Sequence, residues 1–184
     1  FFIFNLSDII KFKNDLLRLN IGYPNIWCKA TDHIEEQIDF IKKLDEKGVL
    51  YKTEDGLYFD TSKISNYGKL ADLDIEGLKE GARIGVVSNK RNKTDFALWK
   101  FSPKDKQRLM EWESPWGVGF PGWHMECSAM GTKYLGEQFD IHGGGMDLMF
   151  PHHEAEIAQS CAALGHDSVR YWMHNNMITI AGKK

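Results

Sequence analysis

The sequence predicts an α/β fold, and three features of the chain support this. Apolar residues recur at helical spacing early in the chain, and short runs rich in β-branched and aromatic residues stand between turn signals. Later, an apolar run at 139–142 leads into three glycines and then Pro151, which suits the first turn of a helix because proline has no amide hydrogen. A strand, a glycine turn and a helix start in this order are typical of a nucleotide or anion site.

Two helices are predicted in residues 1–50. The first covers 7–19 and is capped by Ser7; the second begins near Asp32, with Glu35 placed to complete a start like a capping box, and ends at Gly48. Both carry apolar stripes that are expected to be core. These stripes consist of Ile9, Ile10, Phe12 and Leu16 in the first helix and Ile34, Ile38, Ile41 and Leu44 in the second.

A β-hairpin opens the next part, residues 51–117. Two β-rich runs, 49–52 and 57–60, flank the turn sequence Glu-Asp-Gly at 54–56, and a further strand is predicted at 96–99. A basic cluster of Lys90, Arg91 and Lys93 is interpreted as a solvated loop without a function of its own.

Helices and strands alternate in residues 118–184. The pattern predicts a helix at 123–135, a strand at 139–142, a helix at 151–164 and a strand at 171–174, with a short hairpin arm at 178–180. Six of the seven histidines lie at or after His124, so ionisable groups are concentrated in this part. Two of them, His166 and His174, have no partner visible in the sequence and are interpreted as structural.

One set of residues has the spacing of metal ligands. His152 and Glu156 are four apart on the predicted helix and share a face, and Cys127 lies on the preceding helix. Cysteine, histidine and carboxylate together suit Zn²⁺, and three protein ligands leave a fourth position open. The alternative is a surface hydrogen bond and a buried apolar thiol, since no Cys-x-x-Cys pair accompanies the three residues.

The glycine run at 143–145 is a candidate nucleotide site. His142 ends the preceding apolar run and Asp147 follows shortly afterwards. Bare amides can approach a phosphate closely, and a carboxylate can accept hydrogen bonds from ribose hydroxyls. The spacing of the glycines does not match the dinucleotide fingerprint, so a flexible turn is the alternative.

Composition limits the classes of protein to which the chain can belong. It has 184 residues and a net charge of −3, which gives no argument for nucleic-acid binding by charge alone. Three cysteines at irregular spacing, Cys28, Cys127 and Cys161, argue for a reducing compartment. No signal peptide or membrane-length apolar run is visible, so a cytoplasmic protein without a membrane partner is predicted. The chain starts at Phe1 and is expected to be part of a longer one.

Several motifs resemble those of one enzyme family. Residues 142–160 read HGGGMDLMFPHHEAEIAQS, and residues 122–130 read GWHMECSAM. Further upstream stand ATDHI at 30–34, KRN at 90–92, DFALWK at 95–100 and SPWG at 114–117. Together they resemble the cysteinyl-tRNA synthetases, which are class I aminoacyl-tRNA synthetases, over most of the chain.

The resemblance implies a fold and an activity. The fold would be part of a class I Rossmann-like nucleotide-binding domain, formed by residues 1–50 and 118–184 and interrupted by a connective insertion with a β-hairpin at 51–117. The activity would be ATP-dependent conversion of cysteine to cysteinyl-adenylate, with Mg²⁺, followed by transfer of cysteine to cysteine tRNA. A monomer is expected.

The resemblance also implies roles for individual residues. Zinc held by Cys127, His152 and Glu156 would select the cysteine thiolate over the harder, more basic oxygen of serine. Trp123 would wall the amino-acid pocket. The nucleotide would be bound by His142, Gly143, Gly144 and Asp147, and His153 and Glu154 would support the zinc ligands.

Parts of the family pattern are missing from this chain. A His-Ile-Gly-His signature, a further zinc-binding cysteine, a lysine-rich signature and an anticodon-binding domain do not occur in it, so the chain alone is expected to be inactive. Two other functions stay open. One is a cysteine-activating ligase with an amino-sugar acceptor, and the other is a non-catalytic module stabilised by zinc.

Overall fold

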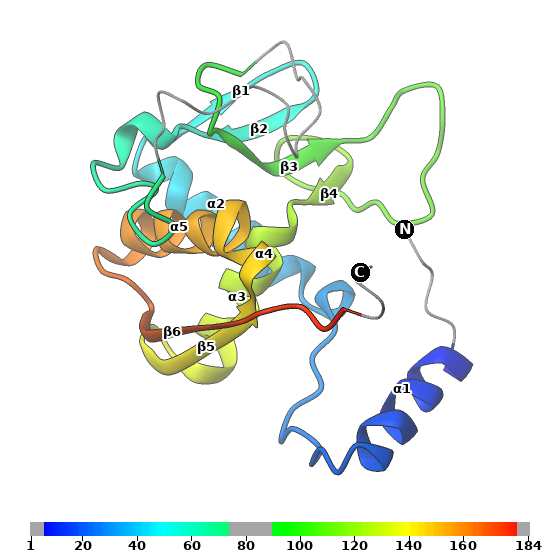
Figure 1. Ribbon diagram of the computed structural model, residues 1–184. Coiled ribbons are helices and arrows are strands. Elements are labelled where there is room, and N and C mark those ends of the chain that lie inside the picture. Colours follow the sequence, from blue (N-terminus) through cyan, green and yellow to red (C-terminus); the bar gives the residue numbers. More distant parts are fainter. Residues whose placement is uncertain (1–5, 74–89, 180–184) are drawn as a thin grey trace.

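The computed structural model describes residues 6–73 and 90–179 and has the α/β architecture that the sequence predicts (Figure 1). A four-stranded antiparallel sheet has the order β1-β2-β3-β4, and a separate parallel pair is formed by β5 and β6. Helices α2, α3 and α5 pack against one another between the two sheets. No helix in the described ranges is long and apolar enough to cross a membrane.

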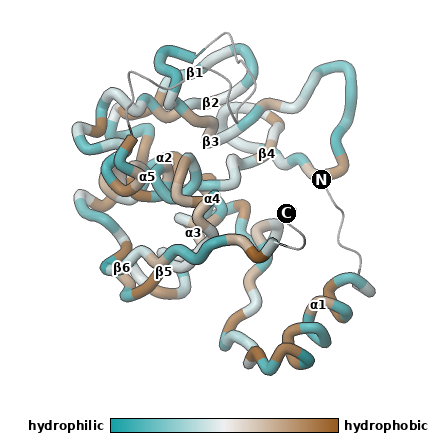
Figure 2. The backbone as a smooth tube through the Cα atoms, in the orientation of Figure 1, coloured by the Kyte–Doolittle hydropathy of each residue, from teal (hydrophilic) through white to brown (hydrophobic). Residues whose placement is uncertain are grey.

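Helix α1 (Leu6–Arg18) forms where the sequence predicts it, but its apolar stripe is not core. Figure 1 shows it apart from the other helices, and Figure 2 shows hydrophobic residues along it. The side chains of Ile10 and Phe12 are about half exposed, at 52% and 53%. The main aromatic contact of Phe12 is the edge of Trp27, itself exposed. The expectation of a buried stripe was wrong because helical spacing reveals an apolar face but not what covers it.

Helix α2 (Ile34–Glu46) confirms the second apolar stripe but not the predicted cap. Ile41 and Leu44 are fully buried, and Gly48 has a positive φ of 67° just after the helix, as expected for a glycine that ends one. The N-cap is His33, not Asp32, and no side chain caps the helix. The His33 ring instead bridges the Lys29 carbonyl and the Tyr134 hydroxyl, each at 2.7 Å. A short 3₁₀ turn, η1 (Ala30–Asp32), precedes it.

The antiparallel sheet confirms the predicted hairpin and the predicted strand. Strand β1 (Leu50–Lys52) pairs with β2 (Gly56–Phe59), and β2 pairs with β3 (Phe96–Phe101). Strand β4 (Gly119–Pro121) completes the sheet beside β3. Trp99 and Phe59 are fully buried, and they belong to the same apolar core as Ile41, Met125 and Ala158 from the helices.

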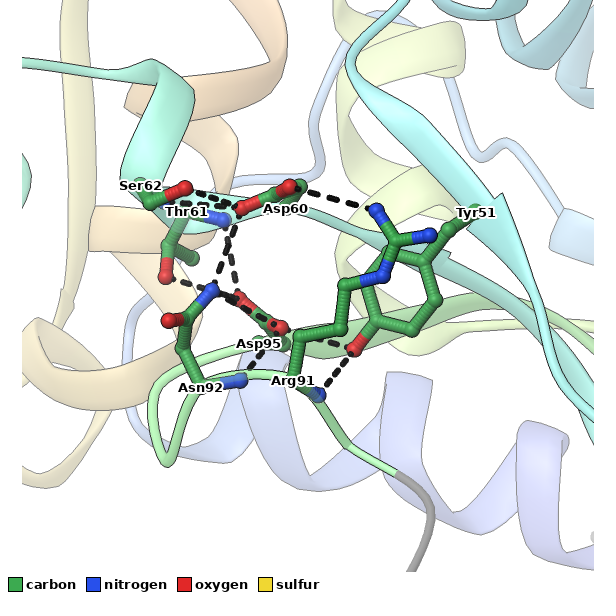
Figure 3. Close-up of polar contacts among 7 residues, drawn as sticks. All are labelled: Tyr51, Asp60, Thr61, Ser62, Arg91, Asn92 and Asp95. Carbon is green, nitrogen blue, oxygen red and sulfur yellow. Dashed lines mark hydrogen bonds and ion pairs between the residues drawn. The ribbon is translucent and has the colours of Figure 1, made fainter.

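A buried carboxylate fastens the two ends of the long connection between β2 and β3. Asp95 is fully buried and accepts hydrogen bonds from the Tyr51 hydroxyl at 2.7 Å, the Thr61 amide and hydroxyl at 2.9 Å each, and the Asn92 amide at 2.9 Å (Figure 3). Thr61 begins a 3₁₀ turn, η2 (Thr61–Lys63). Asp95 therefore ties the end of β2 to the chain that enters β3.

Arg91 of the predicted solvated loop contacts two side chains of the sheet region. Its guanidinium lies 4.3 Å from the centre of the Tyr51 ring and 3.7 Å from Asp60 Oδ2. The side chain is still 62% exposed, so these contacts contribute little beyond orientation.

Helix α3 (Trp123–Leu135) has the predicted bounds, and the segment after it departs from the prediction in one respect. Strand β5 (Phe139–Gly145) continues through all three glycines, which lie opposite Met173, His174 and Asn175 of β6 (Val169–Asn175). The predicted glycine turn was wrong because the parallel partner strand extends the ladder to Gly145. The chain turns only afterwards, through the short helix α4 (Met146–Leu148).

The helix predicted at 151–164 begins later than expected. A π-helical segment, η3 (Met149–His153), is broken by the extended backbone of Phe150, and the regular helix α5 covers Glu154–Leu164. Gly165 ends it in the left-handed conformation, with φ of 85°. The described end of the chain, residues 176–179, contains no strand, and Ile180 of the predicted arm lies outside the described residues.

Glu154 at the start of α5 should stabilise the connection after η2. Its carboxylate is buried and accepts hydrogen bonds from the Gly68 amide at 3.0 Å and the Ala71 amide at 2.8 Å. We expect Glu154→Ala to destabilise the chain by about 2–3 kcal/mol, because a buried and a half-buried backbone amide lose their charged acceptor. Hydrogen exchange should accelerate at these two amides, and Glu154→Gln should give a smaller change. Unchanged protection of both amides in Glu154→Ala would contradict this role.

Candidate metal and nucleotide site

The N-terminus of α3 is fixed on the backbone of β3, which sets the position of Cys127. Gly122 precedes the helix and donates its amide hydrogen to the Leu98 carbonyl at 2.8 Å. A Cβ atom at Gly122 would lie 2.1 Å from the Ala97 carbonyl oxygen, so only glycine permits this approach. The first turns of α3 therefore stand at a defined distance from the antiparallel sheet.

The structure brings Cys127, His152 and Glu156 together, as their spacing suggests. One potential ligand atom from each lies within 4.8 Å of the others. His152 and Glu156 are both only 4% exposed. Glu156 Oε1 is buried and accepts no hydrogen bond among the described residues, although His152 Nε2 lies 3.0 Å from it. Glu156 Oε1 and His152 Nε2 thus lie close together without a hydrogen bond between them, as two ligands of one metal ion would.

The electrostatics of this group favour a bound cation. Burial raises the pKa of the Cys127 thiol, and the negative charges of Glu156 and Glu126 raise it further. The basic side chains within 4.0 Å of the Glu156 carboxylate in the described ranges are two histidines, His142 at 3.5 Å and His152 at 3.0 Å. A buried carboxylate and a thiol that cannot ionise alone would both be stabilised by a divalent ion, so the three residues fit zinc.

Two histidines that the sequence analysis did not assign to the site contact its candidate residues. His124 Nδ1 lies 2.9 Å from His152 Nδ1, and His174 Nε2 lies 2.8 Å from His153 Nδ1. Burial lowers the pKa of His124 to about 3, so its ring is neutral. The position of His124 could have been predicted, because it lies three residues before Cys127 on the same helix. The position of His174 depends on strand register, which the sequence does not reveal.

The two glycines assigned to the nucleotide have different surroundings. A Cβ atom at Gly143 would meet nothing closer than 4.0 Å, whereas one at Gly144 would lie 2.6 Å from His153 Cε1. His142, just before them, stacks on the Trp172 ring at 4.8 Å. Asp147 lies in the middle of the short helix α4, and a Cβ atom on Gly145 would lie 2.5 Å from its Oδ1.

The remaining candidates, Trp123, Glu154 and His153, differ in exposure and in contacts. Trp123 is 58% exposed, and its ring centre is 4.3 Å from that of His152, so it covers this candidate ligand from the solvent side and is not core. Glu154 points away, toward the amides of Gly68 and Ala71. His153 is fully buried and packs against both Trp172 and His142.

Comparison with known proteins relates this chain to one enzyme family. The family model described as tRNA synthetases class I (C) catalytic domain matches residues 4–184. Cysteine–tRNA ligase 1 of Burkholderia lata is 59% identical over 169 residues, which are 92% of this chain and 36% of that protein. The cysteine–tRNA ligase of Deinococcus radiodurans is 56% identical over 173 residues, 94% of this chain and 34% of that protein. The enzyme of Methanococcus maripaludis is 54% identical over 173 residues. The chain thus spans about a third of the length of these relatives.

Proposed function

The chain belongs to the family of class I tRNA synthetase catalytic domains, and on that premise we propose that it is the central part of a cysteine–tRNA ligase. The full-length protein would activate cysteine with ATP, with Mg²⁺, to cysteinyl-adenylate and transfer it to cysteine tRNA. The relatives named cysteine–tRNA ligases, at more than half identity over most of this chain, support this assignment. We further propose that the protein is a cytoplasmic monomer. In this proposal residues 1–50 and 118–184 form parts of the nucleotide-binding domain, and residues 51–117 form the connective insertion.

The observation that carries the proposal is the group formed by half-buried Cys127 and buried His152 and Glu156, whose ligand atoms lie within 4.8 Å of one another. When bound there, zinc supplies a soft Lewis-acidic centre that favours a thiolate over a hydroxyl. The residues of the chain orient the amino acid around it. Trp123 gives the pocket an exposed apolar wall against His152, and neutral His124 holds the other nitrogen of that ring.

The proposed nucleotide site lies next to this group, at the carboxyl end of β5. Ligands of α/β sheets bind beyond the carboxyl ends of parallel strands, which supports His142, Gly143, Gly144 and Asp147 as nucleotide-binding residues. The open space beside Gly143 leaves room for close approach to its backbone. Adenylate formation needs alignment of a carboxylate and a phosphate more than covalent help from the protein, and fixed backbone groups supply alignment.

Two other functions are less well supported. A ligase with an amino-sugar acceptor would share the metal and nucleotide groups, but the relatives are named for tRNA. A purely structural zinc module normally closes its ion with four protein ligands, whereas three come together here. Cysteine-dependent charging of tRNA by the full-length protein separates all three possibilities.

Selectivity for cysteine is the most direct test of the proposal. In the full-length protein substituted with Co²⁺, we expect the sulfur-to-metal charge-transfer absorption to grow when cysteine is added and to stay unchanged with serine. The side chains of the two amino acids differ in one atom, so pocket shape contributes only about 1–3 kcal/mol of discrimination. Cys127 gives a constant background, and the change on adding substrate is the signal. Full-affinity binding of cysteine without any spectral change would refute selection by the metal.

A further inference from the structure

A second group of potential metal ligands lies beside the first. His142, His153 and Glu156 each offer one ligand atom, and these atoms lie within 4.8 Å of one another. We propose that these three side chains bind a second divalent cation, with Glu156 shared between the two ions. The inference rests on the donor geometry and does not require that the protein be a tRNA ligase.

The carboxylate of Glu156 is oriented as a bridge. Its Oε1 lies 3.0 Å from His152 Nε2, whereas its Oε2 lies 3.5 Å from His142 Nδ1. Each oxygen therefore faces the imidazole of a different donor group. Neighbouring ligands of a tetrahedral ion with bonds of about 2.0–2.1 Å stand about 3.4 Å apart, and both separations are close to that value. A carboxylate with one oxygen toward each ion is the usual link in sites whose metals are about 3.5–4 Å apart.

His153 contributes a nitrogen that has no other partner in the described chain. The residue is fully buried, and its Nε2 makes no hydrogen bond. Its Nδ1 lies 2.8 Å from His174 Nε2, so a proton on Nδ1 donated to His174 leaves the Nε2 lone pair free. A histidine ligand typically donates its other ring hydrogen to such a partner, which fixes the tautomer needed to bind a metal. Leaving a polar nitrogen unpaired in the interior is costly, and a bound cation would satisfy it.

The backbone and the packing around His153 hold that nitrogen in place. A Cβ atom on Gly144 would lie 2.9 Å from Nε2 and 2.6 Å from Cε1, so only glycine at this point of β5 leaves room for the ring. Trp172 packs against both imidazoles, with ring centres 4.8 Å from those of His142 and His153. Both rings are thus positioned by the same indole.

The donor set determines which ions the second site takes. Two imidazoles and a carboxylate suit Zn²⁺ and Co²⁺ and leave positions open for water or an anionic group of a substrate. It lacks the thiolate of the first site, so its affinity for zinc should be lower. The first ion should resist dialysis, and the second should bind when free metal is present in excess.

The number of ions bound tests the proposal. Equilibrium dialysis of the full-length protein against excess Zn²⁺, with metal analysis, should give two equivalents for the parent and one for His142→Ala. The variant should keep the Co²⁺–thiolate absorption of Cys127. His166→Ala is the matched control, because His166 is exposed and its Nδ1 contacts the neighbouring Asp167 carbonyl, and it should still bind two. Conversely, Cys127→Ser should keep the second ion.

A measurement on the parent protein alone avoids dependence on variants. With one equivalent of Co²⁺ the electron paramagnetic resonance signal should be that of an isolated ion, and with two it should change through magnetic coupling across Glu156. The proposal would be overturned if the parent bound only one equivalent of metal, or if His142→Ala bound two equivalents or none. It would also be overturned if the parent bound two Co²⁺ ions without magnetic coupling between them.

Discussion

Replacing Asp95 with alanine should lower the free energy of unfolding of this chain by about 3–5 kcal/mol, near the upper end for a single substitution. The reason is the number of donors that converge on its buried carboxylate. The Tyr51 hydroxyl and the backbone amides of Thr61 and Asn92 would all lose their acceptor in the interior. Burial also raises the pKa of Tyr51, so this hydroxyl stays protonated and depends on the acceptor.

Urea denaturation followed by circular dichroism would measure the change. Asp95→Asn keeps one acceptor oxygen but places an NH₂ donor opposite other donors. Its free energy of unfolding should therefore lie between those of the parent and the alanine variant. Asp105→Ala is the control, because Asp105 is exposed and its replacement should change stability by less than about 0.5 kcal/mol. Equal effects of Asp95→Ala and Asp105→Ala would show that the network does not stabilise the fold.

The second large effect is expected at the metal. Cys127→Ser should weaken zinc binding in the full-length protein by at least about 100-fold, since loss of a group that merely orients a ligand already costs 10–100-fold. A serine hydroxyl at this position would have to ionise to replace the thiolate, and it is a far weaker acid.

Competition with a chromophoric chelator would give the two affinities. Cys161→Ser is the matched control, because Cys161 is a half-buried free thiol on α5 outside both ligand groups. It should bind zinc like the parent. If Cys127→Ser retained the parent's affinity, the metal would have to be held by other residues.

Local patterns in the sequence predicted much of the fold. The bounds of α3, the β1–β2 hairpin and strand β3 follow from periodicity and turn residues, which act over a few positions. The prediction that His152 and Glu156 share one helix face is also confirmed, because both residues follow the kink at Phe150. The prediction of a turn at the glycines was wrong because β6, a strand distant in the sequence, pairs with β5 as far as Gly145. The prediction that the apolar face of α1 is buried was wrong because local sequence does not reveal what packs against a helix.

The neighbours of the ligands were the least predictable part of the site. His174 reaches His153 only because β6 runs parallel to β5 with His174 opposite Gly144, and register over 30 residues cannot be inferred from one sequence. Glu154 follows the candidate ligands His152 and His153 in the sequence, yet its carboxylate accepts hydrogen bonds from the amides of Gly68 and Ala71, far away along the chain. Adjacent residues on a helix point in different directions, so neighbourhood in the sequence was a poor guide there.

The Asp95 network also affects how the family can vary. It joins Thr61 to Asn92 directly, so the two ends of the connection between β2 and β3 are held together by the carboxylate itself. In general, doubling the length of a loop costs only about 0.6 kcal/mol of closure entropy. Insertions and deletions should therefore be tolerated during evolution between Ala71, which Glu154 holds, and Asn92. Positions 60–61 and 92–95 should keep their length in every relative that retains the carboxylate.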